Sequence, residues 1–301
     1  AHAKLSGADF IVSGEIESNF EYINKHVFQN DIHFLPSLND IDALPYPAFE
    51  LAHNKSYLPI ITARGCPYHC TYCASGILNN NHFVRRSVNN VVNEIEFWHE
   101  KYGTKNFIFY DDALLFNAET FFIPFAEEIL KRGISVNFHC PNGLHLNEIT
   151  SDVAFLLKEI GFKTLRFGFE TSNSKKQKET GGKVDNKQFA KAITHLKKVG
   201  YQADDLGIYI LCGLPKQEAS EVSETIEFVF DIGAKPILAE FSPIPQTKLW
   251  KEAKENSKYD LENEPLFHNN TILPCQHTGF TADDYQRLKL MTRMKYTVQR
   301  L

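Results

Sequence analysis

Three cysteines in one short loop are the residues of this chain that most directly suggest chemistry. Cys66, Cys70 and Cys73 have the spacing CxxxCxxC and follow the apolar run 57–63. Thiolates are soft ligands, and three of them in one loop suit an iron–sulfur cluster or a zinc ion. A 4Fe–4S cluster ordinarily takes four cysteines, so a loop that offers three leaves one iron free to bind a substrate or cofactor. The loop therefore predicts a metal site that reacts, and not only one that carries electrons.

A structural zinc site is the alternative interpretation of the same loop. Zinc takes four ligands, and His69 or His82 could complete the set. The protein would then be a zinc-stabilised α/β protein with a binding role. Colour separates the two hypotheses, because an iron–sulfur protein is brown and a zinc protein is colourless.

Length and charge limit the remaining possibilities. The chain has 301 residues, of which 43% are hydrophobic and 23% charged, as in ordinary globular proteins. The net charge of −5, from 32 Lys and Arg against 37 Asp and Glu, gives no basic excess for nucleic acid or an anionic membrane. No apolar run approaches the roughly 20 residues that span a bilayer. We therefore expect neither nucleic acid nor a membrane as a partner.

The other cysteines indicate the compartment. Cys140, Cys212 and Cys275 stand alone in the sequence, and each is typical of a small buried side chain. Three clustered and three scattered cysteines indicate a metal site in a reducing cytoplasm and not a disulfide framework. Residues 1–4 contain no initiator Met and no apolar signal segment, so we expect a piece of a longer protein.

Behind the cysteine loop, the sequence alternates between strands and helices. Six short apolar or β-branched runs predict strands at 58–63, 106–110, 135–139, 164–169, 206–211 and 236–241. Amphipathic helices are predicted between them at 88–101, 120–131, 151–159, 186–199 and 219–230, with a final helix at 283–300. Crossovers of this length imply parallel pairing and right-handed winding. An α/β fold with a partial (β/α)6 barrel or a doubly wound sheet is expected.

Unusual residues follow the predicted strands. Asp111 and Asp112 come after the second strand, Glu170 after the fourth, and residues 213–215 after the fifth. In parallel α/β folds the active site lies at this edge of the sheet. Adjacent acids point in different directions, so at most one of the two aspartates should contact a ligand. Capping of the following helix is the structural alternative for this pair.

The cysteine loop and the segments after the predicted strands together resemble the radical S-adenosylmethionine (SAM) superfamily. The resemblance covers roughly residues 57–250. The loop matches the CxxxCxΦC motif of that superfamily, with Tyr72 as the aromatic residue before the last cysteine. Three further segments are similar to its SAM-contacting strand ends. They contain Asp111 and Asp112 after the second strand, Glu170 and Ser172 after the fourth, and Gly213, Leu214 and Pro215 after the fifth.

The resemblance implies an enzyme that uses one 4Fe–4S cluster and SAM. Cys66, Cys70 and Cys73 would hold the cluster, and the amino and carboxylate groups of SAM would chelate the open iron. One electron from the reduced cluster then breaks the C5′–S bond and yields a 5′-deoxyadenosyl radical. Cluster potentials span roughly −700 to +450 mV, and this step needs the low end. The implied partners are a small-molecule substrate and an electron donor such as flavodoxin or ferredoxin.

The segments before the cysteine loop resemble the subgroup that carries a cobalamin-binding domain. Residues 41–47 are similar to its D-x-L-P-x-P linker. Residues 7–15 look like the last strand and helix start of that domain, which predicts a strand at 10–13 and a helix at 15–26. We therefore expect a domain remnant and linker at 1–57, a core barrel at 58–250 and an extension at 251–301, with cobalamin as a possible further cofactor.

Two details depart from that subgroup. Its D-x-H-x-x-G signature is not matched, because Asp31-Ile32-His33 is followed by Pro36. Residues 242–247 resemble a P-x-P-G-T turn in which Gln246 replaces the glycine, an exchange expected to change the backbone there.

The sequence is compatible with two classes of reaction. Radical methylation at an unactivated carbon or phosphorus is one, and a cobalamin-assisted rearrangement or ring formation is the other. A radical SAM methylthiotransferase acting on tRNA or a ribosomal protein is a further alternative, which expects a basic C-terminal domain and a second trio of cysteines. The sequence shows neither feature. The substrate has to be inferred from the pocket, because one fold serves many chemistries.

Overall fold

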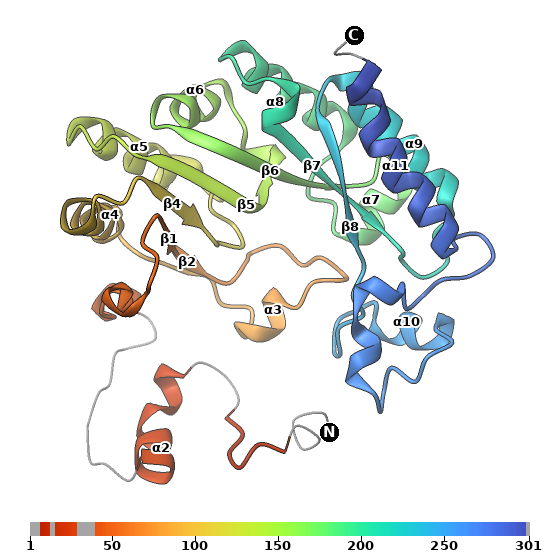
Figure 1. Ribbon diagram of the computed structural model, residues 1–301, viewed down its shortest axis with the longest axis horizontal. Helices are drawn as coiled ribbons and strands as arrows, with labels where there is room; N and C mark the ends of the chain where they lie inside the picture. Colours follow the sequence, from red (N-terminus) through yellow and green to blue (C-terminus); the bar gives the residue numbers. More distant parts are fainter. Residues whose placement is uncertain (1–6, 13–15, 29–39, 299–301) are drawn as a thin grey trace.

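A parallel sheet of six strands forms the centre of the computed structural model, which describes residues 7–12, 16–28 and 40–298 (Figure 1). The strands run in the order β1-β4-β5-β6-β7-β8, and every neighbouring pair is parallel. Their bounds are Tyr57–Ile60, Asn106–Phe109, Asn137–His145, Phe162–Glu170, Leu206–Cys212 and Lys235–Glu240. All six predicted strands are confirmed, and so is the α/β fold with a partial barrel.

Five helices connect successive strands and lie side by side on one face of the sheet (Figure 1). They are α4 Val88–Tyr102, α5 Phe122–Lys131, α6 Ser151–Glu159, α8 Asn186–Lys198 and α9 Ala219–Ile232. Polar side chains cap the starts of α4, α6 and α8, as at Asp185, whose carboxylate accepts a hydrogen bond from the backbone N–H of Gln188. Gly103 ends α4 at a φ of 66°, a left-handed conformation that glycine adopts without steric cost. The predicted helices are therefore confirmed to within two residues.

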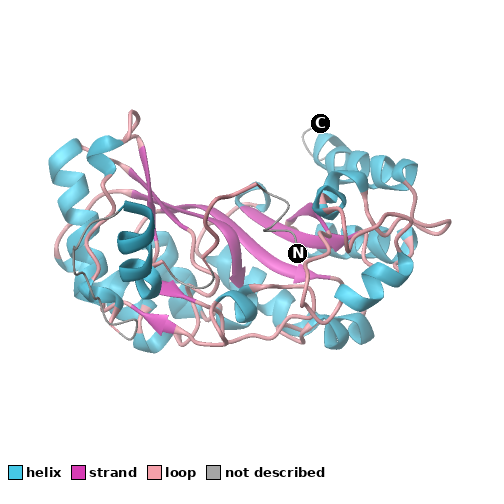
Figure 2. Ribbon diagram, turned by 90° about the horizontal axis from the view of Figure 1, so that it is seen from below, coloured by secondary structure: helices cyan, strands magenta, loops and turns pink. Residues whose placement is uncertain are grey.

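The hydrophobic core lies between this helical layer and the sheet. Alternate strand residues such as Phe107, Phe109, Phe138 and Phe162 are fully or almost fully buried. The rings of Phe109, Phe138 and Phe162 contact one another. The intervening residues point to the opposite face, because successive side chains of a strand alternate. That inner face is not covered by the helical layer (Figure 2). The fold thus leaves one side of the sheet free to bind ligands.

The C-terminal helix α11 (Ala282–Val298) packs against α9 and β8. Leu288 on this helix is buried, and residues 299 and 300 of the predicted helix lie outside the described residues. Between β8 and α11, the chain forms the short helix α10 (Trp250–Asn256) and several single turns. Across the described ranges, no helix combines the length and apolarity needed to cross a membrane.

The N-terminal segment differs in part from the expectation. Residues 10–12 do not form the predicted strand, and residue 13 lies outside the described residues. The predicted helix is present as three short turns of helix, which include α2 (Phe20–Ile23) and together span 17–28. Residues 31–33 and Pro36, where the sequence departs from the cobalamin signature, also lie outside the described part of the chain.

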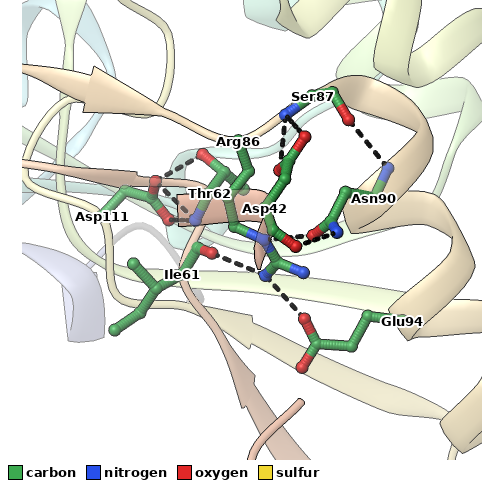
Figure 3. A network of polar contacts seen from close by, with 8 residues as sticks. All are labelled: Asp42, Ile61, Thr62, Arg86, Ser87, Asn90, Glu94 and Asp111. Carbon is green, nitrogen blue, oxygen red and sulfur yellow. Dashed lines mark hydrogen bonds and ion pairs between the residues drawn. The ribbon is translucent and has the colours of Figure 1, made fainter. Parts of the chain in front are cut away.

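A polar network fixes the linker-like segment to the start of α4 (Figure 3). The Asp42 carboxylate accepts from the backbone N–H of Ser87 at 3.0 and 3.1 Å, and its carbonyl accepts from Asn90 Nδ2 at 3.2 Å. Arg86 donates to Asn90 Oδ1 at 2.7 Å and forms an ion pair of 2.6 Å with the buried Glu94. This segment is therefore bound to the barrel by specific contacts.

Candidate functional site

The three loop cysteines face one cavity at the carboxyl edge of the sheet. They lie between β2 (Ala63–Arg64) and the short helix α3 (Ser75–Leu78), and all three line a cavity of about 280 Å³. Gly65 makes the tight entry to the loop possible. Its φ is 84°, and a Cβ there would lie 2.0 Å from the carbonyl oxygen of His82, so no other residue fits.

Contacts from two other parts of the barrel hold this loop in place. Tyr68, between the first two cysteines, donates from its hydroxyl to Glu148 Oε1 at 3.1 Å. Its ring stacks on His145 with the centroids 4.3 Å apart. The backbone N–H of Thr71 donates to the carbonyl of Thr180 at 3.3 Å. The cysteines are therefore carried by a loop whose geometry is set from both sides.

The donor set fits an iron–sulfur cluster. Burial raises the pKa of the Cys66 thiol to about 11 and also raises the pKa of Cys70. Buried thiols become thiolates when a metal supplies the compensating positive charge. Gly181 leaves space beside the loop, because a Cβ there would lie 3.2 Å from Cys70 Sγ. Three soft donors around one cavity can thus hold a cluster.

The zinc alternative needs a fourth ligand at the same place. Neither His69 nor His82 lines the cavity that the three cysteines share. Across the ranges that the structure describes, no three His, Cys, Asp or Glu side chains gather as a site for a single metal ion.

A buried ion pair lies in the cavity wall. Glu170 Oε1 accepts from Lys183 Nζ at 2.9 Å and from the Tyr72 hydroxyl at 2.6 Å. The side chains of Glu170 and Lys183 are only 12% and 14% exposed. Burial by itself lowers the pKa of Lys183, but the charge and hydrogen bond of Glu170 together with the charges of Cys70 and Cys66 outweigh burial, and the pKa is raised. Burial and Glu170 both raise the pKa of Tyr72, so this hydroxyl stays a neutral donor.

The two adjacent aspartates point in different directions, as expected. Asp112 lines the cavity and accepts from Ser75 Oγ at 2.6 Å. The Asp111 carboxylate is buried and accepts from Thr62, from the backbone N–H at 3.0 and 3.1 Å and from Oγ1 at 2.5 Å (Figure 3). Asp111 is not a cavity residue. Its carboxylate joins β1 to the end of β4.

Asp111 gives a testable pH dependence. Burial raises its pKa from 3.8 to about 6, despite the hydrogen bonds from Thr62. The native carboxyl binds a proton more tightly than the unfolded one, so its contribution to stability is full below about pH 4 and is lost as pH rises through about 6. Wild type should lose about 1 kcal/mol more unfolding free energy between pH 5 and pH 7 than Asp111→Asn. Urea unfolding of both proteins at both pH values measures this difference. An equal loss of unfolding free energy in wild type and Asp111→Asn would contradict the prediction.

The remaining predicted residues lie away from the cavity lining. Ser172 hydrogen-bonds Thr225 Oγ1 through its backbone N–H and its hydroxyl, both at 3.1 Å, and so fastens the end of β6 to α9. Gly213, Leu214 and Pro215 are buried beyond the end of β7, and Leu211 lines the cavity in their place. The structure thus brings Cys66, Cys70, Cys73, Tyr72, Asp112 and Glu170 together and leaves Asp111, Ser172, Gly213, Leu214 and Pro215 outside.

Sequence reasoning missed Lys183. Lys175 is nearer to Glu170 in the sequence, but its side chain is 85% exposed and lies near Glu179. Lys183 follows a Gly-Gly pair in a loop, and no local motif marks it. His145, at the end of β5, also lines the cavity. It is buried, its Nδ1 has no hydrogen-bond partner, and burial lowers its pKa to about 3.

The three single cysteines and Gln246, which the sequence analysis also named, do not line the cysteine cavity. Cys140, Cys212 and Cys275 are buried, as expected for single cysteines. Gln246 has a φ of 70°, so the turn keeps a left-handed residue although its glycine is replaced. Gln246 lines a small cavity on the other side of the cysteine loop.

A partial parallel barrel with a three-cysteine loop at its carboxyl edge defines a class of cluster-binding α/β proteins. A family model described as the radical SAM superfamily matches residues 60–229. Because this is more than half of the chain, the protein belongs to the radical SAM superfamily, whose members use a 4Fe–4S cluster and SAM.

Curated relatives include methyltransferases and a cyclase by name. An uncharacterized methyltransferase of Pyrococcus horikoshii is 28% identical over 264 residues, which cover 84% of this chain and 55% of that protein. The bacteriochlorophyllide d C-12(1)-methyltransferase of Chlorobaculum tepidum is 23% identical over 276 residues, which cover 86% and 58%. The chain thus spans a little over half the length of these relatives.

A solved structure shows the same fold. The radical SAM methyltransferase TsrM from Kitasatospora setae, solved with cobalamin and a [4Fe–4S] cluster bound, matches with a TM-score of 0.57 at 16% identity. The match covers 65% of this chain and 39% of TsrM.

Proposed function

We propose that this chain binds a 4Fe–4S cluster through Cys66, Cys70 and Cys73 and cleaves SAM reductively. The observation that carries the proposal is the cavity of about 280 Å³, in which the three thiols face the Glu170–Lys183 pair. This cavity lies at the carboxyl edge of a parallel sheet, where α/β folds place their active sites. Family membership supplies the identity of the two cofactors.

The cluster would supply an open iron for SAM and the electron that releases methionine and a 5′-deoxyadenosyl radical. The residues of this chain bind and orient. Lys183 offers a buried cation to a carboxylate, and Asp112 offers an acceptor to an ammonium group. Leu211 and Ala239 add an apolar wall that excludes water from the reacting atoms.

For the whole protein we infer a cobalamin-assisted methyl transfer to a small molecule. Two relatives are methyltransferases by name, and the solved TsrM structure holds cobalamin. The attachment of Asp42 to α4 supports a domain organisation in which 1–57 leads into a barrel at 58–250, followed by an extension at 251–301. A cobalamin ligand is not assigned to any residue of this chain.

The proposed reaction also requires an electron donor. We infer a flavodoxin or ferredoxin, because Cys73 is exposed and would place one side of the cluster near the surface. A reducing cytoplasm fits the six cysteines, all of which are free thiols. We expect no nucleic-acid partner, since the net charge is −5.

Anaerobic reconstitution with iron and sulfide, followed by dithionite and SAM, tests the proposal. We expect a brown protein that forms 5′-deoxyadenosine, which chromatography detects. EPR of the reduced cluster should change when SAM is added. Binding of zinc in preference to iron, or an EPR spectrum that SAM does not alter, would overturn the proposal.

A further inference from the structure

The inner face of the sheet carries a continuous set of partly exposed polar and aromatic side chains. His139 is at its centre and hydrogen-bonds Thr164 Oγ1 at 3.0 Å and Asn106 Oδ1 at 3.2 Å. The ring of Tyr57 lies 5.7 Å from the ring of His139, which places it on the same face. These residues come from β1, β4, β5 and β6 and contact one another across the open side of the sheet.

Arg166 on β6 lies on this face, in register with Gly207 of β7. Its side chain lies across Gly207, where a Cβ would meet Arg166 Cδ at 2.6 Å and Ile237 Cδ1 at 2.7 Å. Nη1 donates to the carbonyl of Leu165 at 2.9 Å, which fixes the guanidinium and leaves its other donors available. Within the described ranges, no carboxylate forms an ion pair with Arg166.

Such a half-buried guanidinium is well suited to an anion. A charge that is partly removed from water is unfavourable unless an opposite charge pairs with it. Arginine also binds carboxylates and phosphates through two parallel hydrogen bonds. Because Gly207 provides the space for it, Arg166 is held in a prepared position before any ligand binds.

Two exposed aromatic side chains extend from the strands on the other side of this face. Tyr57 at the start of β1 and Tyr110, the residue after β4, are 54% and 48% exposed. Tyr57 is in register with Asn106, four residues before Tyr110, so the two tyrosines lie at different levels along the strands. An exposed aromatic ring offers contact area to a planar or apolar molecule. Tyr110, at the carboxyl end of β4, is therefore the aromatic residue on the cavity side of this face.

This face borders the cysteine cavity, and at the border the Tyr209 hydroxyl donates to the carbonyl of Pro141 on β5 at 2.8 Å. Gly168 and Tyr209 line the cavity, and they lie two residues beyond Arg166 and Gly207 respectively. Two residues along a strand cover about 7 Å on one face. A molecule held at Arg166 can thus present an atom to the cavity.

We propose that Arg166 binds a carboxylate or phosphate group of the substrate, whose aromatic or apolar body rests on Tyr110. This inference rests on the proposed function, because it treats the cavity as the place of reaction. Lys183 lines the cavity itself and is the cation available to the SAM carboxylate. Arg166 lies outside the lining and is therefore free for a second anion.

Equilibrium dialysis of the reconstituted chain with SAM tests this with two probes of equal shape, 2-naphthoate and neutral 2-naphthamide. We expect the naphthoate to bind at least about tenfold more tightly, since hydrogen bonds to charged groups are the stronger ones. Arg166→Gln should abolish the preference, and Arg166→Lys should restore part of it. Tyr110→Ala should weaken both probes equally. The control is Arg132→Gln, a change on the helical side of the barrel where Arg132 pairs with Glu128, and it should keep the preference.

Equal binding of the two probes, or a preference that survives in Arg166→Gln, would overturn the proposal. A loss of SAM affinity in Arg166→Gln as large as the loss for naphthoate would also overturn it, because Arg166 would then belong to the SAM site. Formation of 5′-deoxyadenosine is measured on the same samples. If it is absent while the Arg166-dependent preference is present, the anion site stands and the proposed cleavage of SAM fails.

Discussion

The Cys70→Ala variant is expected to lose the iron–sulfur cluster and, with it, all formation of 5′-deoxyadenosine. Cys70 is one of only three thiols at the cavity, and the remaining cysteines of the chain are buried elsewhere in the barrel or the extension. No neighbouring thiol can therefore take its place. Iron and sulfide content after reconstitution, together with the visible absorbance, measure cluster loss independently of SAM cleavage.

Cys212→Ala is the matched control for this variant. Cys212 is fully buried on β7 but does not line the cavity. Its truncation removes one buried sulfur and should leave the iron content of the reconstituted protein unchanged. Full cluster absorbance in Cys70→Ala, or equal loss of iron in both variants, would contradict the assignment of the loop as the cluster site.

The fold was predictable because it depends on periodic burial. Each central strand is covered by helices on one face, so phenylalanines and branched residues recur in short runs that the sequence displays directly. The β5 strand shows the limit of this rule. It extends to His145, six residues beyond its predicted end, through a register shift between Cys140 and Leu144. A polar, glycine-containing stretch gives no periodic signal for such an irregular extension.

The site was predictable only where its spacing is local. The three cysteines are close in sequence, and their shared cavity follows from one loop. The choice between Asp111 and Asp112 depends on which face of β4 each continues, which is set by the three-dimensional pairing of Asp111 with Thr62. Lys183 reaches Glu170 from a different loop, so no spacing rule connects them.

The backbone at Glu170 explains why the strand end could not be predicted residue by residue. Glu170 has a φ of 66°, which is uncommon for a residue other than glycine, and the register between β6 and β7 shifts between Gly168 and Glu170. This turn directs the carboxylate toward Tyr72 and Lys183. It also places Ser172 beyond the cavity, against Thr225.

The Lys183→Met variant is expected to be about 3–5 kcal/mol less stable than wild type, because it leaves the carboxylate of Glu170 buried without its partner charge. Methionine keeps the length of the side chain, so the effect reports the charge. The pKa of Lys183 is raised in the folded protein. Its contribution to the free energy of unfolding is therefore fully present below the unfolded pKa of about 10.4, and it is lost only as pH rises through the folded pKa. Urea unfolding of the metal-free chain at pH 7 measures it.

Lys175→Met is the control, since Lys175 is 85% exposed and lies 3.9 Å from Glu179. Exposed pairs contribute about 0–1 kcal/mol, so this variant should be close to wild type. The double variant Lys183→Met with Glu170→Gln should regain much of the lost stability, because no unpaired charge is then buried. SAM binding should nevertheless stay weak in the double variant, since the cation offered to the SAM carboxylate is still absent. A Lys183→Met variant as stable as Lys175→Met would show that Glu170 is not a buried charge, and unchanged SAM affinity would remove Lys183 from the proposed SAM site.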